Sequence, residues 1–309
     1  MPDQLSLFPP GFVDRTEKHS DTTTDDRPAD LLPVDEVFDA GNSSRHPADY
    51  LALLDFIQRF PRYSPLNTFL LYIQNPSATL VATAATWLKM SNRRPKIGAR
   101  PLIILAPMSP VVFVYDVAET EGDPVQVNLL RTADLKGSWN NKVYEHTIAN
   151  SALHGIEIRE IPWRERQSAS VLQLTGSIRE SYRTLDISPA ASFLILIDRA
   201  KRIENRYTSL INDLGRIFCG HLGIDSQSWW SDRRGFSTAS ENLEAESVTY
   251  LVCGRKGLKE ITVTLGTASG IWNGRLPRFS LHTILQVVGY IEEMGKSRWK
   301  APKKKSRYK

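Results

Sequence analysis

The 309-residue sequence is poor in cysteine and histidine, and it has no long apolar run. Two cysteines are too few for the disulfide framework of a small secreted protein. No uninterrupted apolar segment approaches the ~20 residues that a membrane-spanning helix needs. The first residues also lack the basic and then apolar pattern of a secretory signal peptide. These absences predict a cytoplasmic protein that has no membrane partner.

The composition is that of an ordinary globular protein, with 41% hydrophobic and 24% charged residues. Its length favours two modest domains with tails. Charge is unevenly distributed: residues 1–49 contain eleven acids and four Lys or Arg, whereas residues 296–309 contain eight Lys or Arg and no acid. This asymmetry indicates a polyanionic partner that the basic tail contacts without sequence preference. We therefore expect Lys303, Lys304 and Lys305 to bind nucleic acid.

The hydrophobic pattern predicts an α+β fold with two domains between two tails. Residues 1–45 are rich in Asp, Thr and Pro, which predicts a disordered acidic tail. The first domain, 46–125, shows helical spacing of apolar residues and then two apolar strands. Its expected elements are helices over about 47–60, 66–74 and 82–90, and strands over 102–106 and 111–115.

The second expected domain, 126–295, contains a sheet and several helices and precedes the basic tail at 296–309. Its strand at 193–197 is almost entirely apolar, which favours a central place in the sheet. Thr238 and Glu241 form a plausible capping box, and Ser280 can cap a final helix. The expected elements are a helix over about 139–152, strands over 156–161, 171–175 and 193–197, and helices over 210–221, 238–253 and 281–291.

The helix over 210–221 has the apolar stripe of a buried zinc-peptidase helix without its ligands. Such a helix normally carries His-Glu-x-x-His, in which two imidazoles bind zinc and the Glu acts as general base. Arginine offers a metal no lone pair, and asparagine is a poor zinc ligand. The sequence therefore predicts no catalytic residue, no metal and no cofactor at these positions. The five residues that replace the motif are Asn212, Asp213, Leu214, Gly215 and Arg216.

The surrounding sequence keeps the frame of such a site. The first helix ends in Phe-Cys-Gly-His at 218–221, and a later helix contains Glu-Ala-Glu at 244–246, followed by Val248 and Leu251. Over roughly residues 150–295 these features resemble the ImmA/IrrE family of metallopeptidases. The resemblance implies a zincin-like fold in which Glu244 stands at the third zinc ligand. With both histidines replaced, it implies a pseudo-metallopeptidase.

Two interpretations of the replaced positions remain open. In the first, the replaced residues form an ordinary polar turn of a core helix. In the second, Arg216 pairs with Glu244, with Asp213 as a further partner, so that its guanidinium occupies the position of the metal. The second follows because a buried carboxylate needs a partner. His221 lies nine residues after Asn212, which on a continuous helix directs it to a different face. We expect it to be a hydrogen-bonded histidine near a helix end and not a replacement ligand.

The first domain carries a second set of motifs. They are Tyr-Ser-Pro-Leu-Asn at 63–67, Gln-Asn-Pro at 74–76, Trp87, Arg-Arg-Pro-Lys-Ile-Gly at 93–98, Tyr-Asp at 115–116 and Thr-Glu-Gly at 120–122. In this order they resemble the N-terminal domain of ArdC-type antirestriction proteins. The resemblance implies binding of single-stranded DNA and a metallopeptidase domain that follows.

The residue types in these motifs are compatible with nucleic acid. Phosphates can be contacted by a cluster of basic residues, and bases can stack on aromatic side chains. An alternative, which we favour for Trp87, is that the aromatic side chains belong to the core. The residues predicted to bind DNA in this domain are Tyr63, Asn67, Trp87, Arg93, Arg94, Lys96 and Arg100, with Tyr72 as a further stacking platform.

The acidic N-terminal segment 1–45, called the head below, contains one short apolar motif, formed by Gln4, Leu5, Ser6, Leu7 and Phe8. It resembles the peptide with which bacterial replication and repair proteins bind the sliding clamp. Leu7 and Phe8 can enter an apolar pocket while Gln4 makes a polar contact, and a disordered flank lets the peptide reach its partner. The alternative is an apolar segment that packs on the body of the protein.

The sequence favours a DNA-associated, non-catalytic regulator, in which an ArdC-like single-strand-binding domain precedes a pseudo-peptidase domain. The resemblances link it to antirestriction or mobile-element functions. One alternative is a zinc-dependent endopeptidase with an atypical site, in which case zinc would be its cofactor. Another is an adaptor that binds the sliding clamp and has little affinity for DNA.

Overall fold

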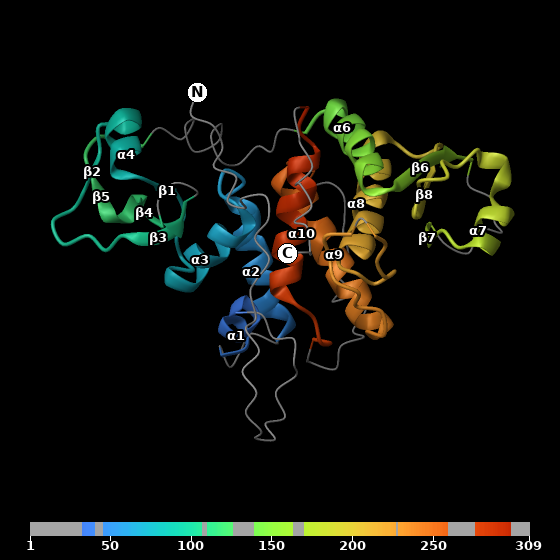
Figure 1. The fold of residues 1–309 in the computed structure, drawn as a ribbon. Coiled ribbons are helices and arrows are strands. Elements are labelled where there is room, and N and C mark those ends of the chain that lie inside the picture. The colour runs from blue at the N-terminus through green and yellow to red at the C-terminus, as the bar shows by residue number, and fades with distance from the viewer. Residues whose placement is uncertain are drawn as a thin grey trace, which may run out of the picture.

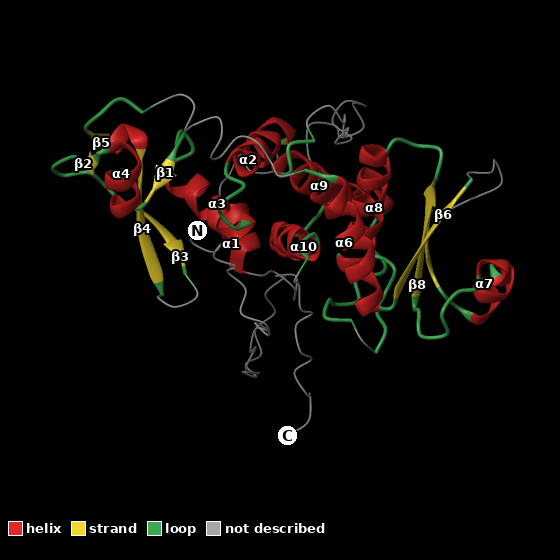
Figure 2. Ribbon diagram, turned by 90° about the horizontal axis from the view of Figure 1, so that it is seen from above, coloured by secondary structure: helices red, strands yellow, loops and turns green. Residues whose placement is uncertain are grey.

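The computed structural model of the chain describes residues 33–40, 46–106, 110–125, 139–162, 170–226, 228–258 and 276–297. Within these ranges a layer of helices separates two groups of short strands, which lie at opposite ends of the molecule (Figures 1 and 2). The predicted α+β fold is confirmed. No described helix is both long and apolar enough to cross a membrane.

The helical layer contains the larger hydrophobic core. Helices α2 and α8 pack against α9, and α1 and α3 pack against α10. Fully buried leucines from four of these helices meet in the core, namely Leu54, Leu214, Leu251 and Leu285. The helices of the layer are α1 (Pro33–Ala40), α2 (Pro47–Arg59), α3 (Pro65–Gln74), α8 (Ile203–Phe218), α9 (Thr238–Arg255) and α10 (Leu281–Met294).

Capping residues set the first turns of the last two helices. Ser280 caps α10 through its hydroxyl, as predicted. The cap of α9 is Ser237, whose hydroxyl accepts a hydrogen bond of 3.2 Å from the backbone N–H of Ser240. The capping box predicted at Thr238 and Glu241 is therefore wrong by one residue, because a serine directly before it already satisfies the free N–H.

One end of the molecule is an antiparallel sheet in the order β1-β4-β3, with a short two-stranded pair and a helix beside it (Figure 1). Strand β3 alternates, with Leu102 and Ile104 buried and Ile103 and Leu105 exposed. The buried side covers a second, smaller core that includes Phe56. The elements here are β1 (Val81–Ala82), α4 (Ala84–Ser91), β2 (Arg94–Pro95), β3 (Leu102–Leu105), β4 (Val111–Asp116), η1 (Val117–Glu119) and β5 (Thr120–Glu121).

Helix α3 lies along the outer edge of β3 and pairs with it through two side-chain amides. The Asn67 amide donates to the carbonyl of Leu105 and accepts from its N–H, both at 3.0 Å. The Gln74 amide makes the same two contacts with Ile103, both at 2.8 Å. These positions are seven residues apart, so both amides lie on one face of the helix. The backbone groups of the edge strand are thereby satisfied without a further strand.

At the other end, β8 lies between a parallel β6 and an antiparallel β7 (Figure 2). The central position predicted for the apolar strand at 193–197 is confirmed, and all five of these side chains are buried. Helix α8 packs on β8 and connects this sheet to the helical layer. The elements are α6 (Asn141–Ser151), η2 (Ala152–His154), β6 (Ile156–Ile161), β7 (Val171–Gln173), α7 (Gly176–Ser181), η3 (Arg183–Leu185) and β8 (Phe193–Asp198).

Ordered structure begins earlier than the sequence predicts. Residues 33–40, assigned to the disordered tail, form α1. The helix is fixed by the buried Asp35 carboxylate, which accepts hydrogen bonds from the Ser280 hydroxyl (2.7 Å) and the His282 N–H (3.0 Å). A carboxylate is stabilised there because the hydroxyl of the cap residue and an N–H of the first turn of α10 both point to it.

The packing of the described residues also shows no division at the predicted domain boundary near 125. Helices α2 and α3 share the larger core with α8, α9 and α10. The buried Arg255 of α9 donates to the carbonyls of Ile57, Phe60 and Tyr63, and it pairs with Glu292 of α10. Sequence periodicity shows which residues turn inward but not which helices share a core.

Candidate functional site

Helices α8 and α9 cross closely at the point where the peptidase-like motif lies. Gly215 lies at this crossing, where a Cβ would be in van der Waals contact with the Ala245 Cα and the Val248 Cβ, both at 3.4 Å. The replaced motif on α8 and the Glu244 turn of α9 are therefore close to each other. The side chains that contact each other between the two helices differ from those that the sequence predicts.

The predicted ion pair between Arg216 and Glu244 is wrong. The Arg216 guanidinium donates to the side-chain oxygens of Asn242 (2.6 Å) and Asn212 (3.4 Å). Asn242 and Glu244 are two residues apart on α9, which places them about 200° apart around its axis. Arg216 thus contacts one side of α9 while the Glu244 carboxylate points to another.

The motif positions do not fit a catalytic metal. Arg216 offers no lone pair, and the Asn212 amide donates to the Thr249 hydroxyl (3.3 Å) while its oxygen accepts from Arg216. Both side chains are therefore engaged with each other on α8 and with neutral polar side chains of α9. Asp213 lies about 100° around α8 from Asn212, and it makes none of these contacts.

Asp213 is a buried carboxyl with an incomplete set of partners. Its Oδ1 accepts from the Ser170 hydroxyl (2.8 Å), whereas Oδ2 has no hydrogen-bond partner among the described residues. Burial raises the pKa of this carboxyl from 3.8 to about 7, against the smaller lowering effects of Ser170, Arg216 and Lys201. Near neutral pH the group therefore exists in both protonation states.

Glu244 is the fully buried centre of a polar cluster. Its two oxygens accept from both terminal nitrogens of Arg233 (2.6 and 2.7 Å), from Nε2 of His221 (2.8 Å) and from the N–H of Ser280 (2.8 Å). Burial by itself raises the pKa of this carboxyl, but the hydrogen bonds from His221 and Arg233 outweigh it, and the pKa lies below its usual range. A guanidinium does accompany the carboxylate, but it comes from Arg233.

Arg233 reaches Glu244 because its loop lies directly on the end of α8. The Arg233 N–H donates to the carbonyl of Gly220 (3.0 Å), and the guanidinium also contacts the carbonyl of Cys219 (3.2 Å). Gly220 has a φ of +82°, and a Cβ there would lie 2.0 Å from the Ser231 carbonyl oxygen. Only glycine allows this turn and this close approach together.

His221 reaches the same cluster from beyond the helix. Helix α8 ends at Phe218, and the left-handed turn at Gly220 redirects the chain. The expected hydrogen bond of His221 is present, and its partner is Glu244. Counting along a continuous helix placed His221 on a different face from the replaced motif. A glycine directly before the histidine and two residues after the end of the helix is a common helix-end signal, and it marks where the helical count no longer applies.

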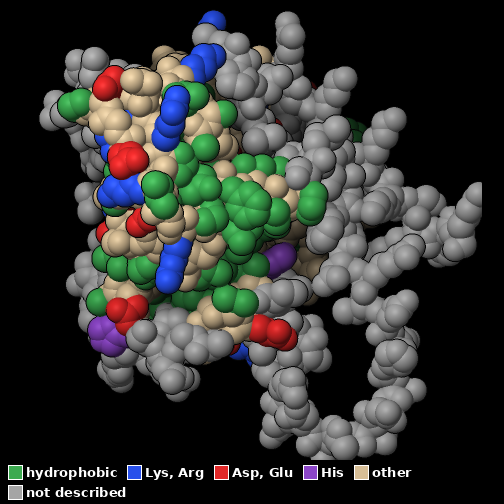
Figure 3. All heavy atoms as spheres, turned by 90° about the vertical axis from the view of Figure 1, so that its left-hand side faces the viewer, with side chains coloured by type: hydrophobic (Ala, Val, Ile, Leu, Met, Phe, Trp, Pro, Cys, Tyr) green, Lys and Arg blue, Asp and Glu red, His purple; other side chains and the backbone are tan. Residues whose placement is uncertain are grey.

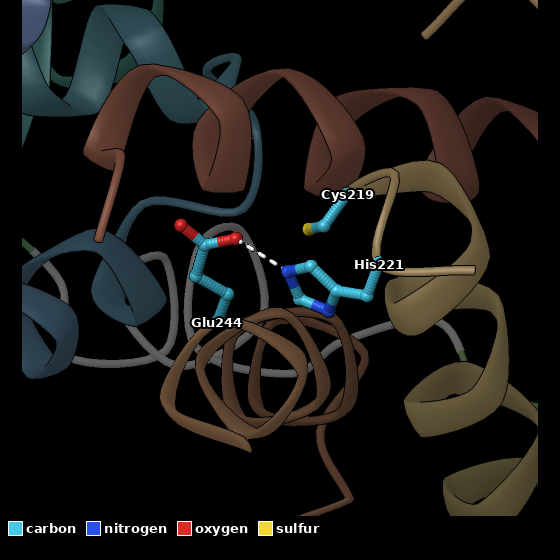
Figure 4. A group of neighbouring side chains, drawn as sticks. All are labelled: Cys219, His221 and Glu244. Atoms are coloured by element: carbon cyan, nitrogen blue, oxygen red, sulfur yellow. Dashed lines mark hydrogen bonds and ion pairs between the residues drawn. The ribbon is translucent and has the colours of Figure 1, made fainter. Parts of the chain in front are cut away.

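Cys219 completes a group that the sequence interpretation missed. The candidate ligand atoms of Cys219, His221 and Glu244 all lie within 4.8 Å of one another, and all three side chains are buried. Figure 4 shows the Cys219 sulfur and the His221 Nε2 directed toward the space in front of the Glu244 carboxylate. Burial raises the pKa of the Cys219 thiol well above its usual range. In the absence of a cation the cysteine is therefore a neutral thiol.

The residues predicted to bind DNA fall into two groups. Asn67 and Trp87 make structural contacts: Asn67 holds the edge of β3, and Trp87, which we favoured as a core residue, is buried and donates to the carbonyl of Tyr115 (2.9 Å). The Arg93 guanidinium is also engaged in hydrogen bonds within the protein, since it donates to the carbonyls of Thr120 and Asp123. The hydroxyl of Tyr63 donates to a backbone carbonyl in β1, and its ring contacts the smaller core.

The exposed members are Arg94, Lys96 and Arg100, of which Lys96 donates from Nζ to the carbonyl of Ala118 (2.7 Å). They lie in or next to β2 and before β3, at the same end of the molecule as the antiparallel sheet. Lys303, Lys304 and Lys305 of the tail and Gln4, Leu5, Leu7 and Phe8 of the head lie outside the described residues.

This end of the molecule also exposes an apolar sheet face that the sequence interpretation did not single out. On β3 and β4, Ile103 lies opposite Phe113 and Leu105 opposite Val111, and Phe113 is 53% exposed. Figure 3 shows hydrophobic side chains gathered on this face with Lys and Arg side chains beside them. The sequence of β4 does not indicate this, because its residues from Val111 to Tyr115 are all apolar, a pattern more typical of a strand that is buried on both faces.

Comparison with known proteins gives two similar structures. No protein-family model matches the sequence, and no curated protein matches it significantly. Both structures are of the antirestriction protein ArdC from the R388 plasmid, one bound to Mn(II) and one metal-free. Each is 13% identical to this chain; the alignments cover 81% and 82% of it and 98% and 91% of the ArdC chains, with TM-scores of 0.35 and 0.31. At this similarity no residue role is carried over from ArdC.

Proposed function

We propose that this chain is a non-catalytic protein that binds single-stranded DNA through the exposed face of its antiparallel sheet. The observation that supports this most directly is the exposed Phe113 on an apolar face, with exposed basic side chains nearby. Single strands are bound without sequence preference by such combinations, since bases stack on aromatic rings and phosphates contact Lys and Arg. A link to antirestriction or mobile-element biology follows from the sequence resemblance and is part of the proposal.

The closed geometry of the peptidase-like frame supports a non-catalytic role. A zinc peptidase needs ligands with free lone pairs and an open coordination position for water. Here Arg216 and Asn212 bond to each other and to α9, and the Glu244 oxygens accept four hydrogen bonds. Asp213 has the carboxyl of a general base but faces Ser170. We therefore propose that α8 and α9 pack together as in such a peptidase but do not catalyse peptide hydrolysis.

A titration with oligothymidine at several salt concentrations tests the DNA proposal. Replacing Arg94, Lys96 and Arg100 with alanine is expected to weaken binding and to reduce the slope of log affinity against log salt by about 2, at ~0.7 per lost phosphate contact on a single strand. Phe113→Ala is expected to weaken binding about fivefold to a hundredfold, as for one lost stacked base, with the salt slope unchanged. Fluorescence anisotropy measures both quantities.

A matched control removes the same number of positive charges elsewhere. Arg183, Lys201 and Arg202 are exposed and lie beside the other sheet. The triple alanine variant at these positions should bind DNA nearly as well as the wild type. Equal losses in the two triple variants would mean that net charge alone acts. Unchanged binding in the first triple variant and in Phe113→Ala would refute this surface as the DNA site.

The head motif supports a second, separable proposal, namely that Gln4, Leu5, Leu7 and Phe8 bind a sliding clamp. Replacing Leu7 and Phe8 with alanine in the full chain should abolish binding to an immobilised clamp, because both apolar anchors are lost. The corresponding change of Leu31 and Leu32 in the same head removes two leucines outside the motif and should leave binding intact. If the unaltered chain gives no response at high micromolar clamp concentration, the motif does not bind clamps.

A further inference from the structure

We propose that Cys219, His221 and Glu244 form a site for a divalent cation of the zinc class, and that Arg233 is the cation that competes for it. This inference is independent of DNA binding. It uses none of the replaced motif positions on α8 and shares only Glu244 with the ligand set that the peptidase resemblance implies.

The three donors define which cation the site prefers. A thiolate, an imidazole and a carboxylate suit zinc and its neighbours cobalt and cadmium, whereas magnesium and calcium prefer oxygen ligands alone. In a tetrahedral zinc site the ligand atoms lie about 3–4 Å apart, given metal–ligand distances of ~2.0–2.3 Å. The three ligand atoms here already lie within 4.8 Å of one another. Side-chain shifts of about an ångström would therefore close the site.

The backbone holds these donors in place from two directions. Cys219 and His221 flank the left-handed Gly220 at the end of α8, and Glu244 lies on α9 (Figure 4). The close α8–α9 contact at Gly215 fixes the distance between these elements. The donors thus belong to rigid parts of the larger core, where little entropy is lost when a cation binds.

The charge balance of the cluster accommodates the exchange. At present the Glu244 carboxylate is neutralised by the Arg233 guanidinium, beside the Cys219 thiol. When a divalent cation enters, the Cys219 thiol releases its proton to water, His221 binds through Nε2, and Arg233 leaves. The thiolate and the carboxylate then balance the two positive charges of the cation. The exchange thus leaves the buried carboxylate with a counter-charge throughout, as burial of charge requires.

Arg233 is the member of the cluster that can leave. Its side chain is 15% exposed, whereas those of His221 and Glu244 are 2% and 0% exposed. It comes from the loop between α8 and α9 and not from a helix, and its guanidinium lies against the ring of Phe236 at 4.4 Å. It can therefore turn toward water without breaking the core, and metal occupancy would be linked to the position of this loop.

Titration of the full chain with Co²⁺ tests the proposal, because a thiolate ligand gives cobalt a characteristic near-ultraviolet charge-transfer band. Arg233→Ala removes the competitor and is expected to bind Co²⁺ on the order of a hundredfold more tightly than the wild type, the equivalent of the ion pair that the metal no longer has to break. Zn²⁺ should displace the cobalt and abolish the band.

Two cysteines allow a matched control. In the Arg233→Ala background, Cys219→Ser should remove the charge-transfer band. Cys253→Ser replaces the other buried cysteine, on the far part of α9, and should leave the band and the affinity unchanged. Loss of the band in both double variants would show that the cluster is not the site.

Stability gives a second readout that does not depend on colour. Zn²⁺ should raise the melting temperature of Arg233→Ala. If this variant is unfolded without metal, Zn²⁺ should instead induce its folding, which circular dichroism detects. Zn²⁺ should do neither for the variant that also carries Cys219→Ser. If Arg233→Ala binds no Co²⁺ when folded, or stays unfolded with Zn²⁺, the proposal is overturned.

Discussion

Replacing Arg233 with alanine is expected to lower the free energy of unfolding by about 3–5 kcal/mol in metal-free buffer. The reason is that Glu244 is fully buried and depends on this guanidinium for its counter-charge, through two hydrogen bonds of 2.6 and 2.7 Å. Removing one partner of such a pair leaves an uncompensated charge in the core. Urea denaturation followed by circular dichroism measures the loss.

The neighbouring arginine provides the control for this experiment. Arg234 pairs with Asp232 at the surface, so Arg234→Ala should leave the unfolding midpoint unchanged. Glu244→Gln combined with Arg233→Ala should recover much of the loss, because the charge that needed a partner is gone. If Arg233→Ala unfolds at the same urea concentration as Arg234→Ala, the buried pair does not stabilise the fold.

Replacing Asp213 with asparagine is expected to stabilise the protein above neutral pH. Burial raises the pKa of this carboxyl from 3.8 to about 7 in the folded chain, so the folded state binds more protons than the unfolded state between these values. Wild-type stability should therefore fall as the pH rises from about 4 to about 7, by on the order of 4 kcal/mol at 1.36 kcal/mol per pKa unit. Asparagine cannot ionise and avoids this cost.

The predicted difference between the two proteins is therefore a function of pH. It should be small near pH 4, close to the unfolded pKa of 3.8, where the folded carboxyl is protonated and ionisation of the unfolded one has only begun to weaken the wild type, and largest at pH 8. Urea unfolding of the wild type and of Asp213→Asn at pH 4, 6 and 8 gives the curve. A destabilised variant at all three pH values would show that the ionised carboxylate has a favourable partner in the folded chain.

The sequence predicts the local elements well and their assembly poorly. The strand at 193–197 and the stripe of α8 are correctly placed because both depend on neighbours along the chain, through period and apolar content. Helix α1 is missed because Asp35 is satisfied only by α10, which follows more than two hundred residues later. No local pattern contains such a contact.

The candidate site shows the same limit in chemical terms. The sequence predicts that Glu244 is buried beside the replaced motif and that an arginine accompanies it. It selects Arg216, which is on the motif, because a helical count can follow residues only within a helix. The arginine that pairs is Arg233, delivered by a loop whose path depends on the left-handed Gly220 and its contact with Ser231. Cys219 and His221 are placed by the same turn.

The amide contacts between α3 and β3 have a consequence for how this molecule meets others. An open sheet edge invites a strand from another chain, which leads to domain swapping or aggregation. At this edge Asn67 and Gln74 already occupy the N–H and carbonyl groups of Leu105 and Ile103. Partners are thus directed away from main-chain pairing and toward the side chains of the sheet face. By covering this edge, helix α3 prevents strand pairing between copies of the chain and leaves the sheet face free to bind a partner.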